Sequence, residues 1–190
     1  MFIFKNSYYL YIENTKILNL NLIKIRDKFT IIYRNNNKQE DIGQLKAFRK
    51  ECRRKSIKFF VVNDLNLLKK LKADGLYISS YNKSLSVLKY KKFIFKTIGS
   101  AHNFNEINIK INQGCDEIIL SRLFKTDYKN KKSFLGVIKF NLISSFYKKN
   151  LIPLGGIRLN NLGKIKLVKS KSFGIMSEIK KKPAIFSRLF

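Results

Sequence analysis

The sequence has few of the residues that build cross-linked, fibrous or zinc-stabilised proteins. Its 190 residues include no tryptophan, one histidine, two prolines and nine glycines. The two cysteines, Cys52 and Cys115, can form at most one disulfide, and they lack the spacing of zinc ligands. We expect both to be small buried hydrophobic residues, since Cys52 lies on the inward face of a predicted helix. This composition excludes a disulfide scaffold, a collagen-like chain and a low-complexity chain.

Long hydrophobic runs are also missing. Lysines interrupt every apolar stretch before it reaches the roughly 18 residues of a membrane span. The segment Met1–Ile12 has neither a sustained apolar core nor the small-residue cleavage site of a signal peptide. The sequence therefore predicts a reduced, cytoplasmic protein without a membrane association.

Acidic residues are scarce, and this scarcity gives the chain a strong positive charge. The 40 Lys and Arg residues exceed the 12 Asp and Glu residues by 28. Such a charge attracts nucleic acids, but it attracts small phosphorylated substrates equally well. The lysines are spread along the chain, no nucleic-acid-binding motif accompanies them, and AT-rich codon usage produces the same bias. Nucleic acid is therefore not expected as the main partner, although a basic nucleic-acid-associated protein remains a hypothesis.

The hydrophobic pattern predicts eight strands that alternate with helices. Hydrophobic residues make up 45% of the chain, enough for one domain over residues 1–190 with a substantial core. The predicted strands are Tyr8–Ile12, Phe29–Tyr33, Lys58–Val62, Gly75–Ile78, Phe93–Ile98, Glu117–Leu120, Leu151–Leu154 and Ser172–Met176. The predicted helices are Lys38–Lys55, Asn103–Asn112, Lys132–Lys149, Asn160–Val168 and Ser177–Phe190, with a further one following Asp64.

Two of these helices carry specific expectations. Asn103 and Glu106 have the spacing of a capping pair, although alternating isoleucines after them would also permit a strand. In Lys132–Lys149, the inward face is expected to consist of Leu135, Ile138, Leu142 and Phe146.

Eight strands with intervening helices predict a compact (β/α)8 TIM barrel of the α/β class. The chain is short for this fold, so some helices must be short, and Asn14–Asp27 is the expected place of an abbreviated first helix. An open doubly wound sheet is the alternative, but no G-x-G-x-x-G motif follows the first strand.

Catalytic groups of such barrels gather at the carboxyl ends of the strands, where this chain has polar residues. Gly155 and Gly156 after the seventh strand allow backbone amides to approach an anion, and Ser177 follows the eighth. Asp64 after the third strand is either a Mg²⁺ ligand or a helix N-cap, and the two roles are weighed equally. His102 is the only histidine, and no nucleophile motif accompanies it, so it is expected to be a hydrogen-bonding loop residue.

Seven short segments, in order along the chain, resemble motifs of the thiamine phosphate synthase and TenI family. They are F-F-V-V-N-D at 59–64, K-A-D-G-L-Y-I at 72–78, S-A-H-N at 100–103, G-C-D-E-I at 114–118, F-K-T-D-Y-K at 124–129, P-L-G-G-I at 153–157 and G-I-M-S-E-I at 174–179. The resemblance implies a (β/α)8 barrel that joins hydroxymethylpyrimidine diphosphate to thiazole phosphate and releases diphosphate with Mg²⁺ present.

The resemblance also implies roles for individual residues. Asn63 and Ser100 would contact the pyrimidine, and Asp64, with Asn82 as a weaker ligand, would bind Mg²⁺. Thr126, Gly155, Gly156 and Ser177 would hold the thiazole phosphate. Lys129 would meet the diphosphate, and Arg34 corresponds to the central arginine of the family's Q-x-R-x-K motif.

The chain departs from the family at several positions. In the Q-x-R-x-K motif, Ile32 stands in place of the Gln and Asn36 in place of the Lys. Asn82 replaces the second magnesium Asp, and Tyr77 replaces a His. Ser79 and Ser80 replace a Gly-Gln pair. A catalytically impaired homologue that still binds a phosphate ligand is therefore an alternative. A TenI-type thiazole tautomerase is a further alternative, although Arg122 stands where that enzyme has its acid-base histidine. A homo-oligomer remains possible, since no pattern in the sequence specifies the assembly.

Overall fold

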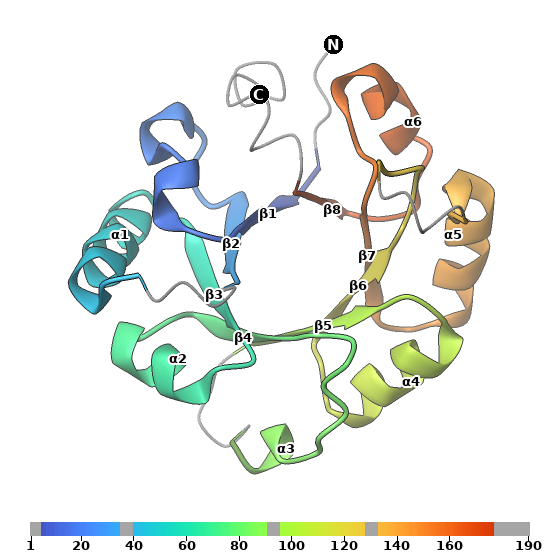
Figure 1. Cartoon of the computed structure of the whole chain (residues 1–190). Helices are drawn as coiled ribbons and strands as arrows, with labels where there is room; N and C mark the ends of the chain where they lie inside the picture. Colours follow the sequence, from blue (N-terminus) through green and yellow to red (C-terminus); the bar gives the residue numbers. More distant parts are fainter. Residues whose placement is uncertain (1–4, 35–39, 91–95, 128–132, 177–190) are drawn as a thin grey trace.

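The computed structural model has eight parallel strands that close into a barrel, and each strand pairs with its neighbour in the chain. It describes residues 5–34, 40–90, 96–127 and 133–176. The strands are β1 (Ser7–Ile12), β2 (Phe29–Tyr33), β3 (Lys58–Val62), β4 (Gly75–Ile78), β5 (Lys96–Ala101), β6 (Glu117–Ser121), β7 (Asn150–Leu154) and β8 (Ser172–Ile175). Figure 1 looks along the barrel axis, with the helices outside the ring of strands. This arrangement confirms the predicted (β/α)8 fold.

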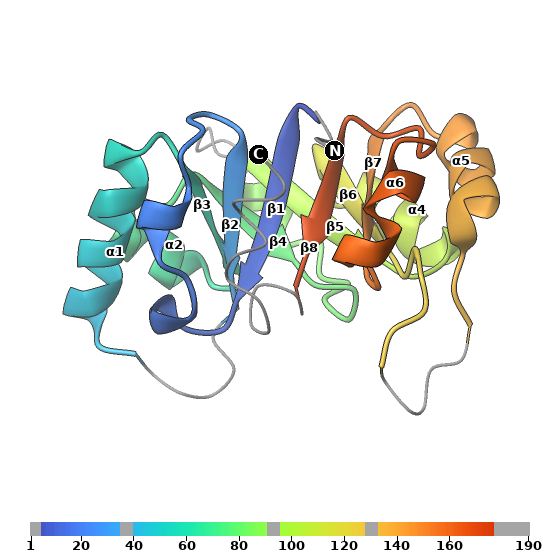
Figure 2. The same cartoon turned by 90° about the horizontal axis from the view of Figure 1, so that it is seen from above.

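The barrel closes between its first and last strands. Ser7 of β1 pairs with Ser172 of β8, and their hydroxyl oxygens lie 2.6 Å apart. Because all eight strands are parallel, their carboxyl ends form a single rim, which lies at the lower edge of the barrel in Figure 2.

Several of the helices around the barrel are short, as the length of the chain predicts. They are α1 (Ile42–Arg54), α2 (Leu65–Leu71), α3 (Val87–Tyr90), α4 (Phe104–Asn112), α5 (Gly136–Phe146) and α6 (Leu162–Ile165), with a 3-10 turn at Leu159–Asn161 before α6. Two 3-10 turns, Thr15–Ile17 and Leu20–Leu22, replace a first helix in the expected segment. None of the helices in the described ranges is long and apolar enough to cross a membrane. The predicted helix Ser177–Phe190 lies outside the described residues.

The capping pair at the start of α4 decides between helix and strand. Asn103 Oδ1 accepts a hydrogen bond from Glu106 N at 2.9 Å, and the Glu106 carboxylate accepts one from His102 N at 2.8 Å. These bonds satisfy amides that have no partner inside the helix. The segment is therefore helical despite its alternating isoleucines.

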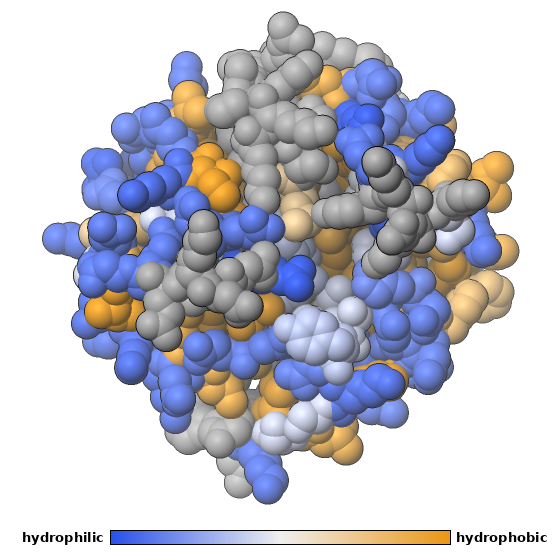
Figure 3. Space-filling model, in the orientation of Figure 1, coloured by the Kyte–Doolittle hydropathy of each residue, from blue (hydrophilic) through white to orange (hydrophobic). Residues whose placement is uncertain are grey.

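The predicted inward face of this helix is right only for Leu135, which directly precedes α5 and packs against the core. Ile138, Leu142 and Phe146 are exposed, whereas Phe140 and Ile143 are buried against the barrel. The segment is apolar on all sides, so its periodicity does not single out one face. Figure 3 shows the resulting hydrophobic surface over α5 at its right edge.

The fifth strand extends beyond its predicted end. It spans Lys96–Ala101, whereas the predicted strand Phe93–Ile98 ended at Ile98, and residues 93–95 lie outside the described residues. The added residues Gly99, Ser100 and Ala101 are small, so the hydrophobic pattern gave little sign of them. A Cβ on Gly99 would lie 2.8 Å from the side chain of Lys110.

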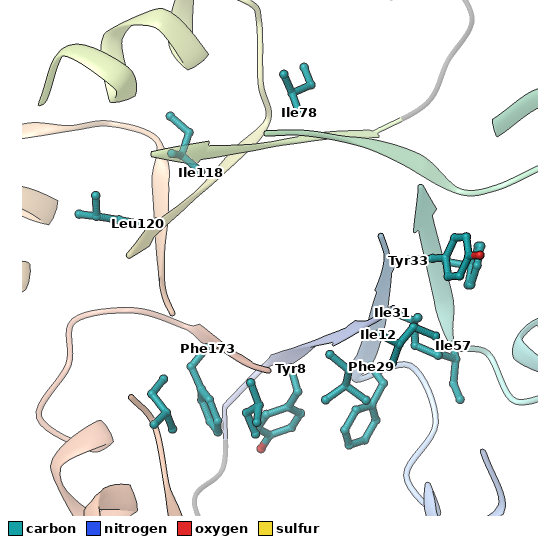
Figure 4. Close-up of a cluster of buried hydrophobic side chains, with 14 of the residues drawn as sticks. Tyr8, Ile12, Phe29, Ile31, Tyr33, Ile57, Ile78, Ile118, Leu120 and Phe173 are labelled. Atoms are coloured by element: carbon teal, nitrogen blue, oxygen red, sulfur yellow. The ribbon is translucent and has the colours of Figure 1, made fainter. Parts of the chain in front are cut away.

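The strands separate two hydrophobic layers. Side chains between the sheet and the helices form the larger layer, and Figure 4 shows ten of them pointing away from the barrel: Tyr8, Ile12, Phe29, Ile31, Tyr33, Ile57, Ile78, Ile118, Leu120 and Phe173. The alternate residues fill the interior: Tyr9, Tyr11, Ile32, Phe60, Tyr77, Ile98, Ile119, Ile152 and Leu154. At the amino end of this interior, the Tyr9 hydroxyl donates to Glu117 Oε2 at 2.6 Å. Both predicted buried cysteines, Cys52 and Cys115, are buried in the outer layer.

Gly75 determines how the interior is packed at β3 and β4. A Cβ there would lie 2.2 Å from Phe60 Cε1 and 2.3 Å from the Lys96 carbonyl oxygen. The Phe60 ring therefore occupies the space that a side chain at position 75 would need.

We expect Gly75→Ala to lower the free energy of unfolding by about 3 kcal/mol, because either the ring or a strand must move. Gly163→Ala in α6 is the matched control, since nothing lies within 4 Å of its added methyl group. Chemical denaturation of both variants measures the difference. Equal stabilities would contradict the proposed packing of Phe60 over Gly75.

Candidate active site

Asn63 organises one side of the rim. Its Nδ2 donates to Ser79 Oγ at 2.6 Å and to the Tyr81 hydroxyl at 3.0 Å. Its Oδ1 accepts hydrogen bonds from Ser79 N at 3.1 Å and from Asn82 Nδ2 at 3.2 Å. The backbone of Asn63 is left-handed, with φ 54°, which turns the side chain toward the β4 loop. The structure thus brings together Asn63 and Asn82, two residues that the sequence singled out separately.

Asp64 acts as a helix cap. Its Oδ1 accepts a hydrogen bond from Leu67 N at 2.8 Å at the start of α2, and its side chain is exposed at the rim. The N-cap role, one of its two predicted roles, is therefore present.

The residues present also fit a magnesium ion that arrives with a phosphorylated substrate. Mg²⁺ is commonly held by one or two carboxylates together with substrate phosphates and water. Asp64 supplies one carboxylate, and capping uses only one of its oxygens. Asn82 fits less well, because its Oδ1 already accepts a hydrogen bond from Ser84 N at 3.1 Å. Within the described ranges, no group of three or more His, Cys, Asp and Glu residues forms a metal site of its own.

Ser100, Tyr77, Tyr11 and Arg34 meet where the barrel interior opens to the rim. Burial raises the pKa of Tyr77, and the neighbouring Ser100 side chain and the positive charge of Arg34 partly oppose this rise. The rings of Tyr11 and Tyr77 stand perpendicular, with centroids 5.6 Å apart. Arg34 itself is exposed. A cation, buried hydroxyl groups and two aromatic rings therefore lie near one another at this end of the barrel.

Gly155 and Gly156 turn the chain sharply after β7. Their φ angles are +95° and +68°, a region that favours glycine. A Cβ on Gly156 would lie 2.5 Å from the carbonyl oxygens of Phe124 and Lys125, so the turn packs directly on the loop after β6.

A cavity of about 230 Å³ opens beside Gly156, and three of the residues that line it are cations. The lining residues are Phe124, Lys125, Phe134, Gly156, Arg158, Asn160, Asn161 and Lys164. Asn161 shapes its floor by donating to the Gly156 carbonyl at 2.7 Å and accepting from Arg158 N at 2.8 Å. Backbone amides at glycine turns and cationic side chains are the groups with which proteins bind phosphate.

The sequence analysis missed Lys125, Arg158 and Lys164. Arg158 follows Gly156 by two residues, and this closeness in the sequence could have identified it as a candidate anion-binding residue. Arg158 also pairs with Asp127 at 2.5 Å, which ties the loop after β6 to the loop after β7.

A second cavity, of about 440 Å³, lies between the loops after β5 and β6. Its lining residues are His102, Ser121, Arg122, Ser133, Phe134, Leu135 and Lys139. Ser121 Oγ and His102 Nδ1 are 2.9 Å apart, as expected for a hydrogen-bonding loop histidine. Arg122 reaches Thr126 Oγ1 at 3.4 Å. Phe134 lines both cavities, so they adjoin, whereas Thr126 is not among the described lining residues of either.

Two predicted site residues, Lys129 and Ser177, lie outside the described residues. Their roles remain predictions.

The fold and the rim define a class: a (β/α)8 barrel with a polar cluster after β3 to β5 and a cation-lined cavity after β6 and β7. A family model described as thiamine monophosphate synthase matches residues 11–179. The chain belongs to this TMP-TENI family.

Individual relatives agree with this assignment at low identity. The chain is 28% identical over 137 residues to a thiamine-phosphate synthase of Pelagibacter ubique, covering 70% of this chain and 65% of the relative. It is 24% identical over 148 residues to a thiamine-phosphate synthase of Prochlorococcus marinus strain AS9601, covering 77% of this chain and 42% of the relative. The matches thus span less than two thirds of the length of these two relatives.

A solved structure confirms the fold. The thiamine phosphate pyrophosphorylase from Pyrococcus furiosus superimposes with a TM-score of 0.71 at 16% identity, covering 97% of both chains.

The two roles of Asp64 are separable by substitution. We expect Asp64→Ala to lower the free energy of unfolding by about 1 kcal/mol, whereas Asp64→Asn, which keeps a capping oxygen, leaves it nearly unchanged. Thermal and chemical unfolding measure both variants. If both variants lost the same free energy of unfolding, capping would not be the contribution of the Asp64 side chain to stability.

Proposed function

We propose that the chain joins hydroxymethylpyrimidine diphosphate to thiazole phosphate and releases diphosphate, as a transferase of thiamine biosynthesis. Family membership supports the reaction class, and the Gly156 cavity carries the proposal for this chain. One phosphorylated substrate needs an anion site, and the other needs a separate polar surface that recognises a pyrimidine. The rim offers both, on neighbouring groups of strands.

The thiazole phosphate would lie in the Gly156 cavity. The left-handed glycine turn lets backbone amides come close to phosphate oxygens. Lys125, Arg158 and Lys164 would supply the compensating charge, and Ser177 and Thr126 are proposed to donate hydroxyl hydrogen bonds.

The pyrimidine would lie across the opening between Asn63 and Ser100. The amide of Asn63 is held by Ser79 and Asn82, so it is already oriented before a substrate binds. Tyr77 and Tyr11 offer aromatic surface beside Ser100. This arrangement would position the methylene carbon of one substrate against the nitrogen of the other.

In the proposed reaction, the thiazole nitrogen forms a bond to the pyrimidine methylene carbon while the bond from that carbon to the diphosphate oxygen breaks. The diphosphate leaves with the bonding electron pair, and the new thiazolium carries the positive charge. Arg34 and Lys129 would stabilise the charge that develops on the departing oxygen. Asp64 would hold Mg²⁺, which when bound neutralises part of the diphosphate charge.

We expect purified protein, both substrates and Mg²⁺ to release diphosphate in a coupled assay. Lys129→Ala should lower the rate at least about a hundredfold, because a charge on the leaving group would lose its partner. Asp64→Asn should lower the rate without lowering stability, which separates metal binding from capping. No release at high enzyme concentration would refute the transferase proposal.

A binding protein without turnover is the second candidate, and Ile32 favours it. This residue, which replaces the family glutamine, is fully buried in the barrel interior and offers no hydrogen bond to a substrate. At position 77, where the family has a histidine, this chain has the buried hydroxyl of a tyrosine in place of an imidazole. A TenI-type tautomerase is disfavoured, because Arg122 cannot exchange a proton near neutral pH as a histidine does.

Thermal-shift measurements distinguish the two candidates. A protein that only binds should gain several degrees in melting temperature with saturating thiazole phosphate, yet release no diphosphate. Lys164→Gln should reduce that gain, since it removes a cation from the Gly156 cavity. An unchanged gain in this variant would place the phosphate elsewhere.

A further inference from the structure

A groove of about 310 Å³ lies between α1 and α2, on the outside of the barrel. Six of its seven lining residues are cations: Lys46, Arg49, Lys50, Arg53, Lys70, Leu71 and Lys72. The groove shares no residue with the two rim cavities. α2 ends at Leu71, shortly before β4 begins at Gly75, so the groove opens toward the amino ends of the strands. It is therefore remote from the proposed active site.

Two of these cations are held in fixed positions. Arg49 is only 4% exposed, and its Nη2 donates to Asp74 Oδ1 at 2.6 Å and to the Lys72 carbonyl at 3.3 Å. Arg53 Nη2 donates to the same carbonyl at 2.9 Å. One carbonyl oxygen thus orients two guanidinium groups at the wall of the groove. Arg49 Nε is buried and has no hydrogen-bond partner among the described residues.

The charge in the groove is only partly compensated by the protein. Lys46, Lys50 and Arg53 follow one another at spacings of four and three residues, which places them on one face of α1. Like charges at these spacings destabilise a helix. The nearby acid Glu51 pairs with Arg54 at 2.8 Å, and Asp74 pairs with Arg49. An anion in the groove would remove the remaining repulsion.

Lys72 adds a cation at a backbone position that does not favour lysine. It caps α2 in the left-handed conformation, with φ 46° and ψ 50°, where glycine or asparagine is usual. A side chain there costs conformational energy that glycine would avoid. Its contribution is a further positive charge on the groove.

We propose that this groove binds a condensed phosphate chain, either inorganic or carried by a nucleotide. The charged face of α1 from Lys46 to Arg53 spans about 10 Å, the scale of a short phosphate chain. Sites for single-stranded nucleic acids combine cations with aromatic side chains that stack on bases, and none of the described residues that line this groove is aromatic. The proposal is independent of the transferase reaction at the rim.

Calorimetric titration of the full chain with tripolyphosphate, at fixed physiological salt, tests the proposal. Lys46→Gln combined with Lys50→Gln should weaken binding about tenfold. Lys148→Gln combined with Lys166→Gln is the matched control, because it removes the same charge from exposed positions outside the groove and should change the affinity less than twofold. Equal losses in the two double variants, or no measurable binding to the unaltered chain, would overturn the proposal.

Three further arms locate the site and define its ligand. Lys164→Gln removes a rim cation and should leave tripolyphosphate binding unchanged, and a loss there would move the binding to the rim. ATP binding as tightly as tripolyphosphate, or more tightly, supports a site for the phosphate chain, and orthophosphate should bind much more weakly. A single-stranded RNA that binds far more tightly than tripolyphosphate, with the same loss in the groove variant, would overturn the ligand assignment in favour of nucleic acid.

Lys72→Gly provides a test in which stability and binding move in opposite directions. Glycine relieves the left-handed backbone, so the melting temperature of the free protein should rise. The affinity for tripolyphosphate should fall, because a charge leaves the groove. A variant that is more stable and binds tripolyphosphate unchanged would show that Lys72 takes no part in the site.

Discussion

Closure of the parallel sheet is the constraint on which the rest of the structure depends. Pairing of β8 with β1 brings the carboxyl ends of all eight strands to one rim. Residues far apart in the sequence then share a site: Gly156 packs on the backbone of Phe124 and Lys125, and Arg158 pairs with Asp127. An open sheet would leave the loops after β3 and β7 too far apart to hold two substrates against each other. The interior that supports the ring depends on specific fits, of which Phe60 over Gly75 is the tightest.

The sequence predicted the strands well where both faces of a strand are buried. The bounds of β2, β3 and β4 coincide with the predicted ranges, because short apolar runs flanked by polar residues are unambiguous. The carboxyl end of β5 was missed because the strand continues through Gly99 and Ser100, whose small side chains carry no hydrophobic signal. The face of α5 was misassigned because that helix is apolar all round, and only the barrel surface selects Phe140 and Ile143.

The candidate site was predictable in its positions but not in its contacts. Placement of polar residues after apolar strands was enough to select Asp64 and Gly156, and the family resemblance added Asn63. The hydrogen bond between Asn63 and Asn82 depends on the left-handed backbone at position 63, and the sequence does not predict this backbone conformation. The cations of the Gly156 cavity were missed because, in a chain with a net charge of +28, no single lysine stands out. Spatial convergence, and not abundance, distinguishes a functional cation here. The same criterion separates the groove between α1 and α2 from the rest of the basic surface.

The central claim is that the glycine turn after β7 and its surrounding cations hold a phosphate group at the rim. A crystal structure of the chain with bound thiazole phosphate tests it most directly. We predict phosphate oxygens within hydrogen-bond distance of the Gly156 amide and of at least one of Lys125, Arg158 and Lys164. A thiazole phosphate whose phosphate group lies away from this turn would contradict the account.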